Sequence, residues 1–295
     1  MALTPIKNKK DKWGYKDESG KIVIPCIYDC VSTFNHSIAL VYKNKEWRFI
    51  DEEGNLIPKG KYDFVTEPRN GYSSVAKNHR WGLIDMDGNE VIPCRYDFVE
   101  PFVDGVAKIK MKDKFGLINT NGDTILPCQY DTIEGFSEGM AVVCQGNYFG
   151  YVNNQGVQVT PCIYDFASEF LCGMGRVKKL NKYGIIGHDG KELAPCIYDA
   201  VIDSDGFAYV NKNGKWGCLN CDGTAIIPCK FDGIQTFYDG IVCVYSDGKW
   251  GVMDYLGNQI VPCVYASPEE AKESVPSNTE DENTSDSSAS EDERE

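Results

Sequence analysis

Apolar and polar residues alternate over short stretches along almost the whole chain. The stretches LIN at 117–119, VIP at 91–93 and AKI at 107–109 are typical, since they are brief and rich in β-branched residues. An apolar residue at every second position is the pattern of a strand with one face in a core, and no long segment has the period of a helix. The pattern therefore predicts an all-β protein.

The alternation recurs in eight tandem copies, each of which starts at an aromatic–Gly pair. Successive aromatic residues of these pairs lie 34 positions apart, or 33 in one case. A fixed period of this length predicts an array of like units rather than a set of unrelated domains. The pairs are Trp13-Gly14, Trp81-Gly82, Phe115-Gly116, Phe149-Gly150, Tyr183-Gly184, Trp216-Gly217 and Trp250-Gly251, and Trp47-Arg48 marks a degenerate copy.

Turn residues divide each copy into strands. Asp87-Gly88 and Asn121-Gly122 lie between the first two strands of their copies, and such pairs suit two-residue hairpin turns with positive φ at both centres. A Pro such as Pro127 ends the second strand, because it cannot donate a ladder hydrogen bond. We expect a three-stranded antiparallel meander in each copy, to which the segment Tyr-Asp-x-Val/Ile adds a short fourth strand.

The repeated aromatic residue is interpreted as a packing residue. Trp, Phe and Tyr replace one another at this position, and a ligand site seldom recurs in every packing layer. The adjacent Gly suits a place where another backbone or ring passes closely. The aromatic–Gly pair therefore indicates core construction rather than ligand stacking.

The motif K-W-G-x-[IV]-D-x-x-G-x-x-[IV]-[IV]-P-x-x-Y-D, followed by F-x-x-G-x-A-x-V, resembles the WG-repeat (KWG-repeat) family. The resemblance covers residues 12–265, and the copy at 47–79 departs from it at Arg48 and Lys59. The family is found mostly in bacteria, and its members are generally taken as interaction modules of unknown partner. It implies no catalytic residues.

Eight meander units can close or stay open. We favour a β-propeller-like ring over an open β-solenoid or superhelical array, because no terminal unit shows the polar end face that open arrays need. The shortness of the unit is an argument for the open form, since a four-stranded propeller blade usually has roughly 40–45 residues.

The net charge of −14 is concentrated at the C-terminus. We divide the chain into a repeat array at 1–267 and a disordered acidic tail at 268–295, in which Thr279, Ser288 and Ser290 match acid-directed phosphorylation sites. The negative charge argues against nucleic-acid and membrane partners. With no signal peptide and no spanning segment, we expect a cytoplasmic monomer.

Cysteine chemistry is not expected. Seven of the thirteen cysteines follow the repeated Pro and are interpreted as small buried residues. Cys218 and Cys221 form the only C-x-x-C, without a second pair or a His cluster, so we expect no metal site and no cofactor.

The basic residue before the repeated aromatic is the candidate binding feature. In a closed array these residues form a ring on one rim that could attract an acidic protein partner or the tail, although exposed residues leaving a turn would show the same pattern. They are Lys12, Arg80, Lys114, Lys182, Lys215 and Lys249.

No catalytic motif is present, so we predict a non-enzymatic scaffold or adaptor for protein–protein interaction. The alternative is a carbohydrate-binding or surface-glycan-binding repeat protein, which would need solvent-facing aromatic residues. Its candidates are Tyr72, Tyr151, Tyr238 and Tyr255.

Overall fold

A computed structural model describes residues 2–35, 37–204, 206–236 and 240–276, without the side chains of 58–61 and 236. Almost every element in this part of the chain is an antiparallel strand, as the alternation predicted. Residues 277–295, with the three proposed phosphorylation sites, lie outside the described residues, and so does Tyr238.

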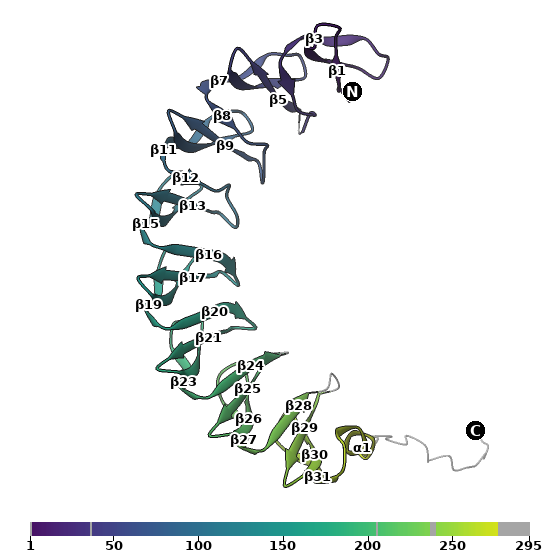
Figure 1. Cartoon of the computed structure of the whole chain (residues 1–295), viewed down its shortest axis with the longest axis vertical. Helices are drawn as coiled ribbons and strands as arrows, with labels where there is room; N and C mark the ends of the chain where they lie inside the picture. Colours follow the sequence, from purple (N-terminus) through teal and green to yellow (C-terminus); the bar gives the residue numbers. More distant parts are fainter. Residues whose placement is uncertain (1, 36, 205, 237–239, 277–295) are drawn as a thin grey trace, which may run out of the picture.

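The strands form eight antiparallel sheets that follow one another along the chain (Figure 1), and each sheet pairs strands that are consecutive in sequence. Sheet 1 contains β1 (Thr4–Lys7), β2 (Trp13–Lys16) and β3 (Ile22–Tyr28). Sheet 2 contains β4 (Cys30–Val31), β5 (Ile38–Lys43), β6 (Glu46–Asp51) and β7 (Leu56–Tyr62). Sheet 3 contains β8 (Phe64–Val65), β9 (Tyr72–Lys77), β10 (Arg80–Asp85) and β11 (Glu90–Tyr96). Sheet 4 contains β12 (Phe98–Val99), β13 (Val106–Met111), β14 (Lys114–Asn119) and β15 (Thr124–Tyr130).

The second half of the array has the same plan and ends in the helix α1 (Pro268–Glu273). Sheet 5 contains β16 (Thr132–Ser137), β17 (Met140–Gln145), β18 (Tyr148–Asn153) and β19 (Gln158–Tyr164). Sheet 6 contains β20 (Phe166–Leu171), β21 (Met174–Lys179), β22 (Lys182–Ile186) and β23 (Glu192–Tyr198). Sheet 7 contains β24 (Ala200–Ser204), β25 (Phe207–Lys212), β26 (Lys215–Leu219) and β27 (Ala225–Phe231). Sheet 8 contains β28 (Gly233–Thr236), β29 (Ile241–Ser246), β30 (Lys249–Asp254) and β31 (Gln259–Tyr265).

The sequence repeat and the sheet are offset by half a unit. The copy that starts at Lys114 supplies β14 and β15 to sheet 4, and then β16 and β17 to sheet 5. The predicted short fourth strand therefore exists, but it is the first strand of the next sheet. Because the chain passes to a new sheet in the middle of each copy, backbone hydrogen bonds tie each of these copies to two sheets.

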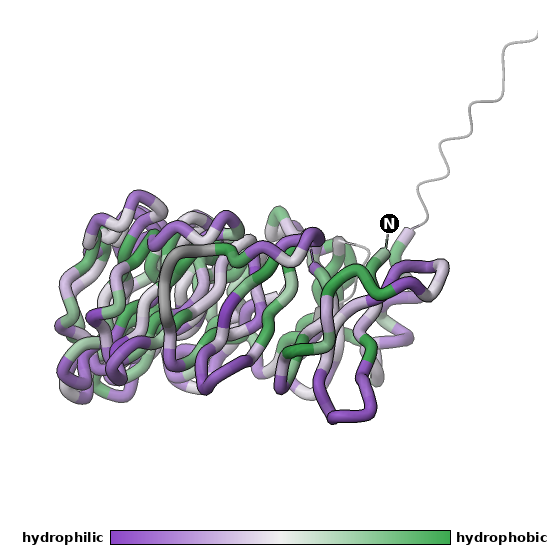
Figure 2. The backbone as a smooth tube through the Cα atoms, turned by 90° about the horizontal axis from the view of Figure 1, so that it is seen from above, coloured by the Kyte–Doolittle hydropathy of each residue, from purple (hydrophilic) through white to green (hydrophobic). Residues whose placement is uncertain are grey.

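The core lies between neighbouring sheets. Leu83 and Ile92 of sheet 3 pack against Val99 and Ile109 of sheet 4, while Ile84 on the opposite face belongs to the core shared with sheet 2. Successive strand residues point to opposite faces, so consecutive apolar residues fill two cores. Figure 2 shows the result, with hydrophobic strands inside and hydrophilic segments at the periphery.

The aromatic–Gly pair has the packing role that the sequence indicated, with one correction. A Cβ at Gly116 would lie 2.5 Å from the carbonyl oxygen of Leu126, so only Gly fits where the next strand crosses. The aromatic partner Phe115 packs against its core cluster but stays half-buried, because it lies near the end of its strand. The fully buried aromatic residue of this copy is Tyr130, in the Tyr-Asp pair.

The two-residue turn with positive φ at both centres is found at a different place from the one expected. Lys112 and Asp113, between the second and third strands of sheet 4, both have positive φ, at 51° and 63°. The loop at Asp87-Gly88 instead joins the third and fourth strands of sheet 3 and has positive φ only at the Gly. The loop is longer than a two-residue turn because the Asp85 side chain closes it. Its Oδ1 accepts the N–H of Asn89, four residues later, at 2.7 Å.

The sheets lie along an open arc (Figure 1), and closure into the ring that the sequence favoured stays a prediction. The last strands β11, β15 and β19 lie on its outer side, and the first strands lie towards the inside. At one end, α1 covers the free face of sheet 8, where Ala271 is fully buried among Val252 and Val261. At the other end, Lys16 holds the position at which sheet 3 has the buried Ile84.

These two features are the end caps that the sequence reasoning did not find. Helix α1 also changes the predicted domain boundary, because residues 268–273 are helical and packed rather than part of a disordered tail. Ser267 begins the helix by accepting the N–H of Glu270 at 3.2 Å, and Pro268 stands in the first turn.

Candidate functional site

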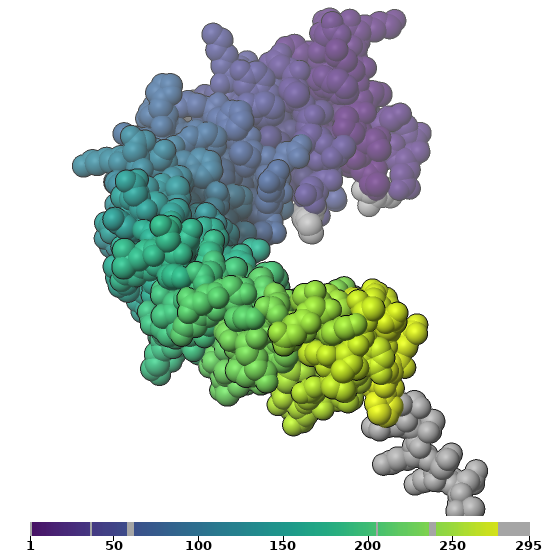
Figure 3. Space-filling model, turned by 60° about the horizontal axis from the view of Figure 1, so that its bottom comes forward, coloured from purple at the N-terminus to yellow at the C-terminus, as the bar shows by residue number. Residues whose placement is uncertain are grey.

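A groove runs along the first strands of sheets 2, 3 and 4 and has a volume of about 1150 Å³. These strands lie towards the inside of the arc, and the molecule curves around an open space on that side (Figure 3). The aromatic lining comes from two repeat positions in successive units. The Trp of the pair contributes Trp47 and Trp81, and the residue after Tyr-Asp contributes Phe64 and Phe98. The groove is therefore itself periodic.

The groove exists because the first strands there are short. β8 ends at Val65 and β12 ends at Val99, after two residues each. Pro68 and Pro101 follow shortly, and Pro cannot donate a ladder hydrogen bond. Pairing resumes only as the single bridges Arg69↔Tyr72 and Val103↔Val106. Phe64 and Phe98, which begin these short strands, are 47% and 41% exposed and line the groove.

The polar groups of the groove include free charges of both signs. Glu67 and Arg69 have no ion-pair partner in the part of the chain that the structure describes, while Glu100 is paired with Lys108 at 3.0 Å. The Asn70 side chain donates to the Phe102 carbonyl at 3.0 Å, which ties the loop after β8 of sheet 3 to the loop after β12 of sheet 4. A ligand in the groove would meet aromatic rings along its length and one carboxylate and one guanidinium at its edge.

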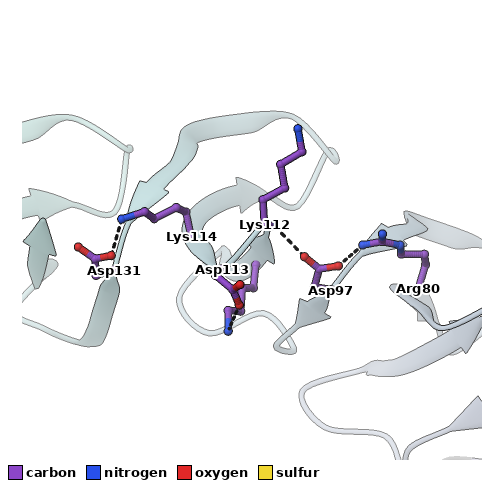
Figure 4. Close-up of polar contacts among 7 residues, drawn as sticks. Arg80, Asp97, Lys112, Asp113, Lys114 and Asp131 are labelled. Atoms are coloured by element: carbon purple, nitrogen blue, oxygen red, sulfur yellow. Dashed lines mark hydrogen bonds and ion pairs between the residues drawn. The ribbon is translucent and has the colours of Figure 1, made fainter. Parts of the chain in front are cut away.

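Five of the six predicted rim cations are bound to Asp residues of their own copies, and Figure 4 shows two of these pairs. Each is paired with the Asp of the Tyr-Asp pair, which follows 17 residues later. Lys249 has no such partner among the described residues, because Ala266 stands in place of Asp. The pairs are Lys12–Asp29, Arg80–Asp97, Lys114–Asp131, Lys182–Asp199 and Lys215–Asp232.

The same Asp residues join neighbouring sheets. Asp97 binds Arg80 of sheet 3 through one oxygen and accepts the N–H of Lys112, in the hairpin turn of sheet 4, through the other at 2.7 Å (Figure 4). Asp131 makes the same bridge, and its hydrogen bond from Lys114 lowers the pKa of its carboxyl group. Each of these Asp residues is therefore a sheet-to-sheet joint, and the ion pairs neutralise most of the rim.

The Tyr residues considered for glycan binding do not come together. Tyr151 is fully buried, and its hydroxyl donates to the Ser168 carbonyl at 2.7 Å. Tyr72 of sheet 3 packs on Phe102 of sheet 4, with the ring centroids 4.8 Å apart. Tyr255 is exposed and follows β30, the third strand of sheet 8. Accessible aromatic rings are found in the groove instead, at a repeat position that the sequence reasoning did not single out.

Comparison with known families agrees with the repeated geometry. A family model described as "WG containing repeat" matches residues 13–47, 47–79, 81–115, 115–149, 149–183, 183–216 and 216–250. The chain belongs to this family. Six of the seven matched segments run from one repeated aromatic to the next, the segment 47–79 ends two residues before Trp81, and the eighth copy begins at the end of the last segment.

No curated protein matches the chain in sequence. Among solved structures, a eukaryotic initiation factor is 8% identical, with a TM-score of 0.34, over 88% of this chain and 94% of that one. The AfRom2 CNH domain is 13% identical, with a TM-score of 0.29, over 85% and 92%. Hsv2 of Kluyveromyces lactis is 9% identical, with a TM-score of 0.25, over 74% and 71%. These likenesses carry no inference about this chain.

The degenerate WG repeat accommodates Arg48 by a longer bulge. Residues 58–61 separate the paired positions Ile57 and Tyr62, whereas three residues, 93–95, separate the corresponding positions of sheet 3. The guanidinium of Arg48 binds Glu46 at 2.8 Å, and Glu46 stands where other WG repeats have the rim cation. The copy has therefore moved its positive charge by two positions, and a cavity of about 420 Å³ lies beside the pair.

A partly buried ion pair lies between two neighbouring sheets, and the sequence reasoning did not find it. Arg176 of sheet 6 lies 3.5 Å from Asp203 of sheet 7, between Nη1 and Oδ2, and donates to the Val201 carbonyl at 3.0 Å. Burial raises the pKa of the Asp203 carboxyl group. Lys108 of sheet 4 occupies the same repeat position as Arg176 and donates to the equivalent carbonyl, of Ile133, at 3.4 Å, whereas other WG repeats have Val142 or Ser74 there.

Within the described ranges, no group of His, Cys, Asp or Glu side chains could hold a metal ion. Cys218 is buried, which raises the pKa of its thiol to about 12, whereas Cys221 is exposed in the following loop. The Cys after the repeated Pro is half-buried, as Cys94 shows, with its thiol directed at the Val75 carbonyl at 3.7 Å. No described helix is long and apolar enough to cross a membrane.

Proposed function

We propose that this WG-repeat protein is a non-enzymatic adaptor that binds a segment of a protein partner in the groove of sheets 2, 3 and 4. The observation that supports the proposal is the groove itself, which spans three units and exposes an aromatic ring in successive units. Large apolar rings that are open to solvent and bordered by polar groups are typical of interaction sites. The net charge of −14 favours a protein over a nucleic acid as the partner.

The test is the dependence of partner capture on the groove. Full-length chain, the double variant Phe64→Ser/Phe98→Ser and the control Phe166→Ser are used as baits in parallel affinity purifications. Phe166 occupies the same repeat position in sheet 6, is 40% exposed and lies outside the groove. We expect a protein that the wild type and the control retain and the double variant loses. Equal recovery on all three baits contradicts the proposal.

Carbohydrate binding is the second candidate, and the same exposed rings favour it. Phe64 and Phe98 could stack on sugar rings, with Glu67, Arg69 and Asn70 as hydrogen-bonding groups. A glycan array probed with the wild type and the double variant separates the two functions. Groove-dependent binding to glycans, without a groove-dependent protein partner, would replace the adaptor proposal.

A further inference from the structure

The spacing of the groove selects a class of partner, provided that the groove is the binding site proposed above. Sheets that pack face to face lie about 10 Å apart, so equivalent rings of sheets 3 and 4 repeat at about that distance. A polyproline II helix has three residues per turn and a rise of about 3.1 Å per residue, so its equivalent positions repeat every ~9 Å. Every third residue of such a helix can therefore meet the same repeat position of successive sheets, at Phe64 and then at Phe98.

An added β-strand fits the groove less well. A strand presents side chains to one face every ~6.8 Å, which does not match the sheet spacing. Strand addition also needs a long, free edge, and β8 and β12 have two residues each before Pro68 and Pro101 interrupt the ladder. Without strand addition, the groove must recognise a ligand through side-chain contacts. A polyproline II helix is suited to such binding, because its conformation does not depend on hydrogen bonds within its backbone.

The charges at the edge of the groove add a second requirement. Glu67 is exposed and has no ion-pair partner among the residues that the structure describes, whereas Glu100 is held by Lys108. A basic residue beside the proline-rich segment would complete an ion pair with Glu67. Arg69, on the same loop, is free to donate to a backbone carbonyl of the ligand.

We propose that the groove binds a proline-rich segment of a protein partner in the polyproline II conformation, with Pro at every third position on the aromatic rings and a basic residue near Glu67. The shape and the charge of the groove together define this class of partner. Aromatic-lined grooves are the common means of binding such segments, because the extended helix is formed before binding and loses little entropy.

The experiment uses the full chain and three synthetic peptides in isothermal titration calorimetry. The first peptide has Pro at every third position and Lys next to the repeat, the second has the same composition in scrambled order, and the third replaces Lys by Glu. We expect the first to bind most tightly. Phe64→Ala or Phe98→Ala should weaken it about tenfold, as loss of a central aromatic contact does. Phe166→Ala should leave the dissociation constant unchanged, and Glu67→Gln should remove the preference for Lys over Glu.

Each outcome decides the proposal. Equal affinity for the ordered and scrambled peptides overturns it, and so does equal weakening by Phe64→Ala and Phe166→Ala. Absence of binding by the first peptide also overturns it, provided that circular dichroism shows the wild-type fold. If the affinity purifications still find a groove-dependent partner in that case, the adaptor function stands and only the proline-rich class is wrong. If they find none, both proposals fail.

Discussion

The first strands divide the array into two regions that are otherwise built alike. They have two residues in sheets 2, 3 and 4, but six, six and five residues in sheets 5, 6 and 7. Both regions share the buried faces between sheets, the Gly at the strand crossing and the Asp joints. The groove lies in the first region only. The edge strand can thus change while the core of the repeat stays constant.

A single position illustrates the cause. Sheet 4 has the sequence Glu100-Pro101-Phe102 after its first pairing residues, and sheet 5 has Glu134-Gly135-Phe136 at the same place. The ladder of sheet 5 resumes at the pair Phe136↔Ala141, whereas sheet 4 resumes one residue later, at Val103↔Val106. The difference teaches that a repeat array can open a binding groove by interrupting an edge, without any change to its buried layers.

The largest expected effect tests the feature that the two regions share. Gly82→Ala in sheet 3 and Gly184→Ala in sheet 6 would each place a methyl group within 2.8 Å of a backbone carbonyl oxygen. Since backbone cannot yield as a side chain can, we expect each to lower the free energy of unfolding by about 3 kcal/mol. Chemical denaturation measures this, with Gly135→Ala as control, because nothing lies within 4 Å of a Cβ there. A large loss in only one region would break the claim that the two cores are alike.

The next effect concerns the ends of the arc. Ala271→Asp would bury an unpaired charge beneath α1 and should release the helix from sheet 8, at a cost of about 2 kcal/mol. In an array whose units touch only their neighbours, the loss should stay local. Hydrogen exchange should therefore accelerate in β29 to β31 and remain unchanged around the groove. The exposed Glu273→Gln is the control.

Small-angle scattering on the wild-type protein tests the overall shape of the array. An elongated, curved particle is the expected result. A compact disc would show that the array closes in solution, with α1 displaced from the face that a ring would need.

The Asp joints should contribute less, and unequally between sheets. Asp131→Ala removes both the Lys114 ion pair and the acceptor for the Gly146 N–H, whereas Asp63→Ala removes only an acceptor for the Asn78 N–H. We expect both losses to be small, with the larger one at Asp131, since exposed ion pairs add little. Equal losses at the two sites would show that the cation contributes nothing.

The Asp131 joint also sets a pH dependence. The carboxyl group has a folded-state pKa below its ordinary value of 3.8. Its contribution is therefore full above pH 3.8 and is lost as the pH falls through the lower, folded-state pKa. The difference in the free energy of unfolding between wild type and Asp131→Ala should therefore shrink as the pH falls below 3.8. Urea denaturation at several pH values measures it.

The sequence predicted the parts of the fold that depend on local pattern. Alternation gave the strands, the period gave the number of copies, and Gly116 gave the close backbone approach, because each of these is fixed by a residue and its neighbours in sequence. The resemblance to the WG-repeat family rested on the same positions, and the family match confirmed it. What could not be read in this way was any contact between units.

The Asp joint and the groove show why. Asp97 binds Arg80, which precedes it by 17 residues, and Lys112, which follows it by 15, and no local rule pairs such positions. Predicting the groove would have required knowing that Phe64 and Phe98, which are 34 residues apart, line the same surface. A signal for the end cap was present, since Ser267 and Glu270 bracket Pro268 as at a helix start, but the acidic composition drew the interpretation towards disorder.

The smallest change in stability should come from exchanging the residues that distinguish the two regions, yet this exchange tests the comparison most directly. In Gly135→Pro, the ladder of sheet 5 should open as in sheet 4, so the Met140 amide, which faces Ser137 of the first strand, should exchange faster with solvent. In Pro101→Gly, the Val106 amide, which donates to the Val103 carbonyl, should exchange more slowly, because residue 101 then has an N–H that can extend the ladder. We expect either variant to change the free energy of unfolding by less than about 1 kcal/mol, since Pro and Gly act largely through the unfolded chain. Hydrogen exchange followed by mass spectrometry measures both amides, with Ala39 of sheet 2 as internal reference.

If Pro101→Gly narrows the groove, binding there should weaken while stability stays constant. Unchanged exchange in both variants would mean that the edge is short for a reason other than Pro101, and that the difference between the regions lies in their cores after all.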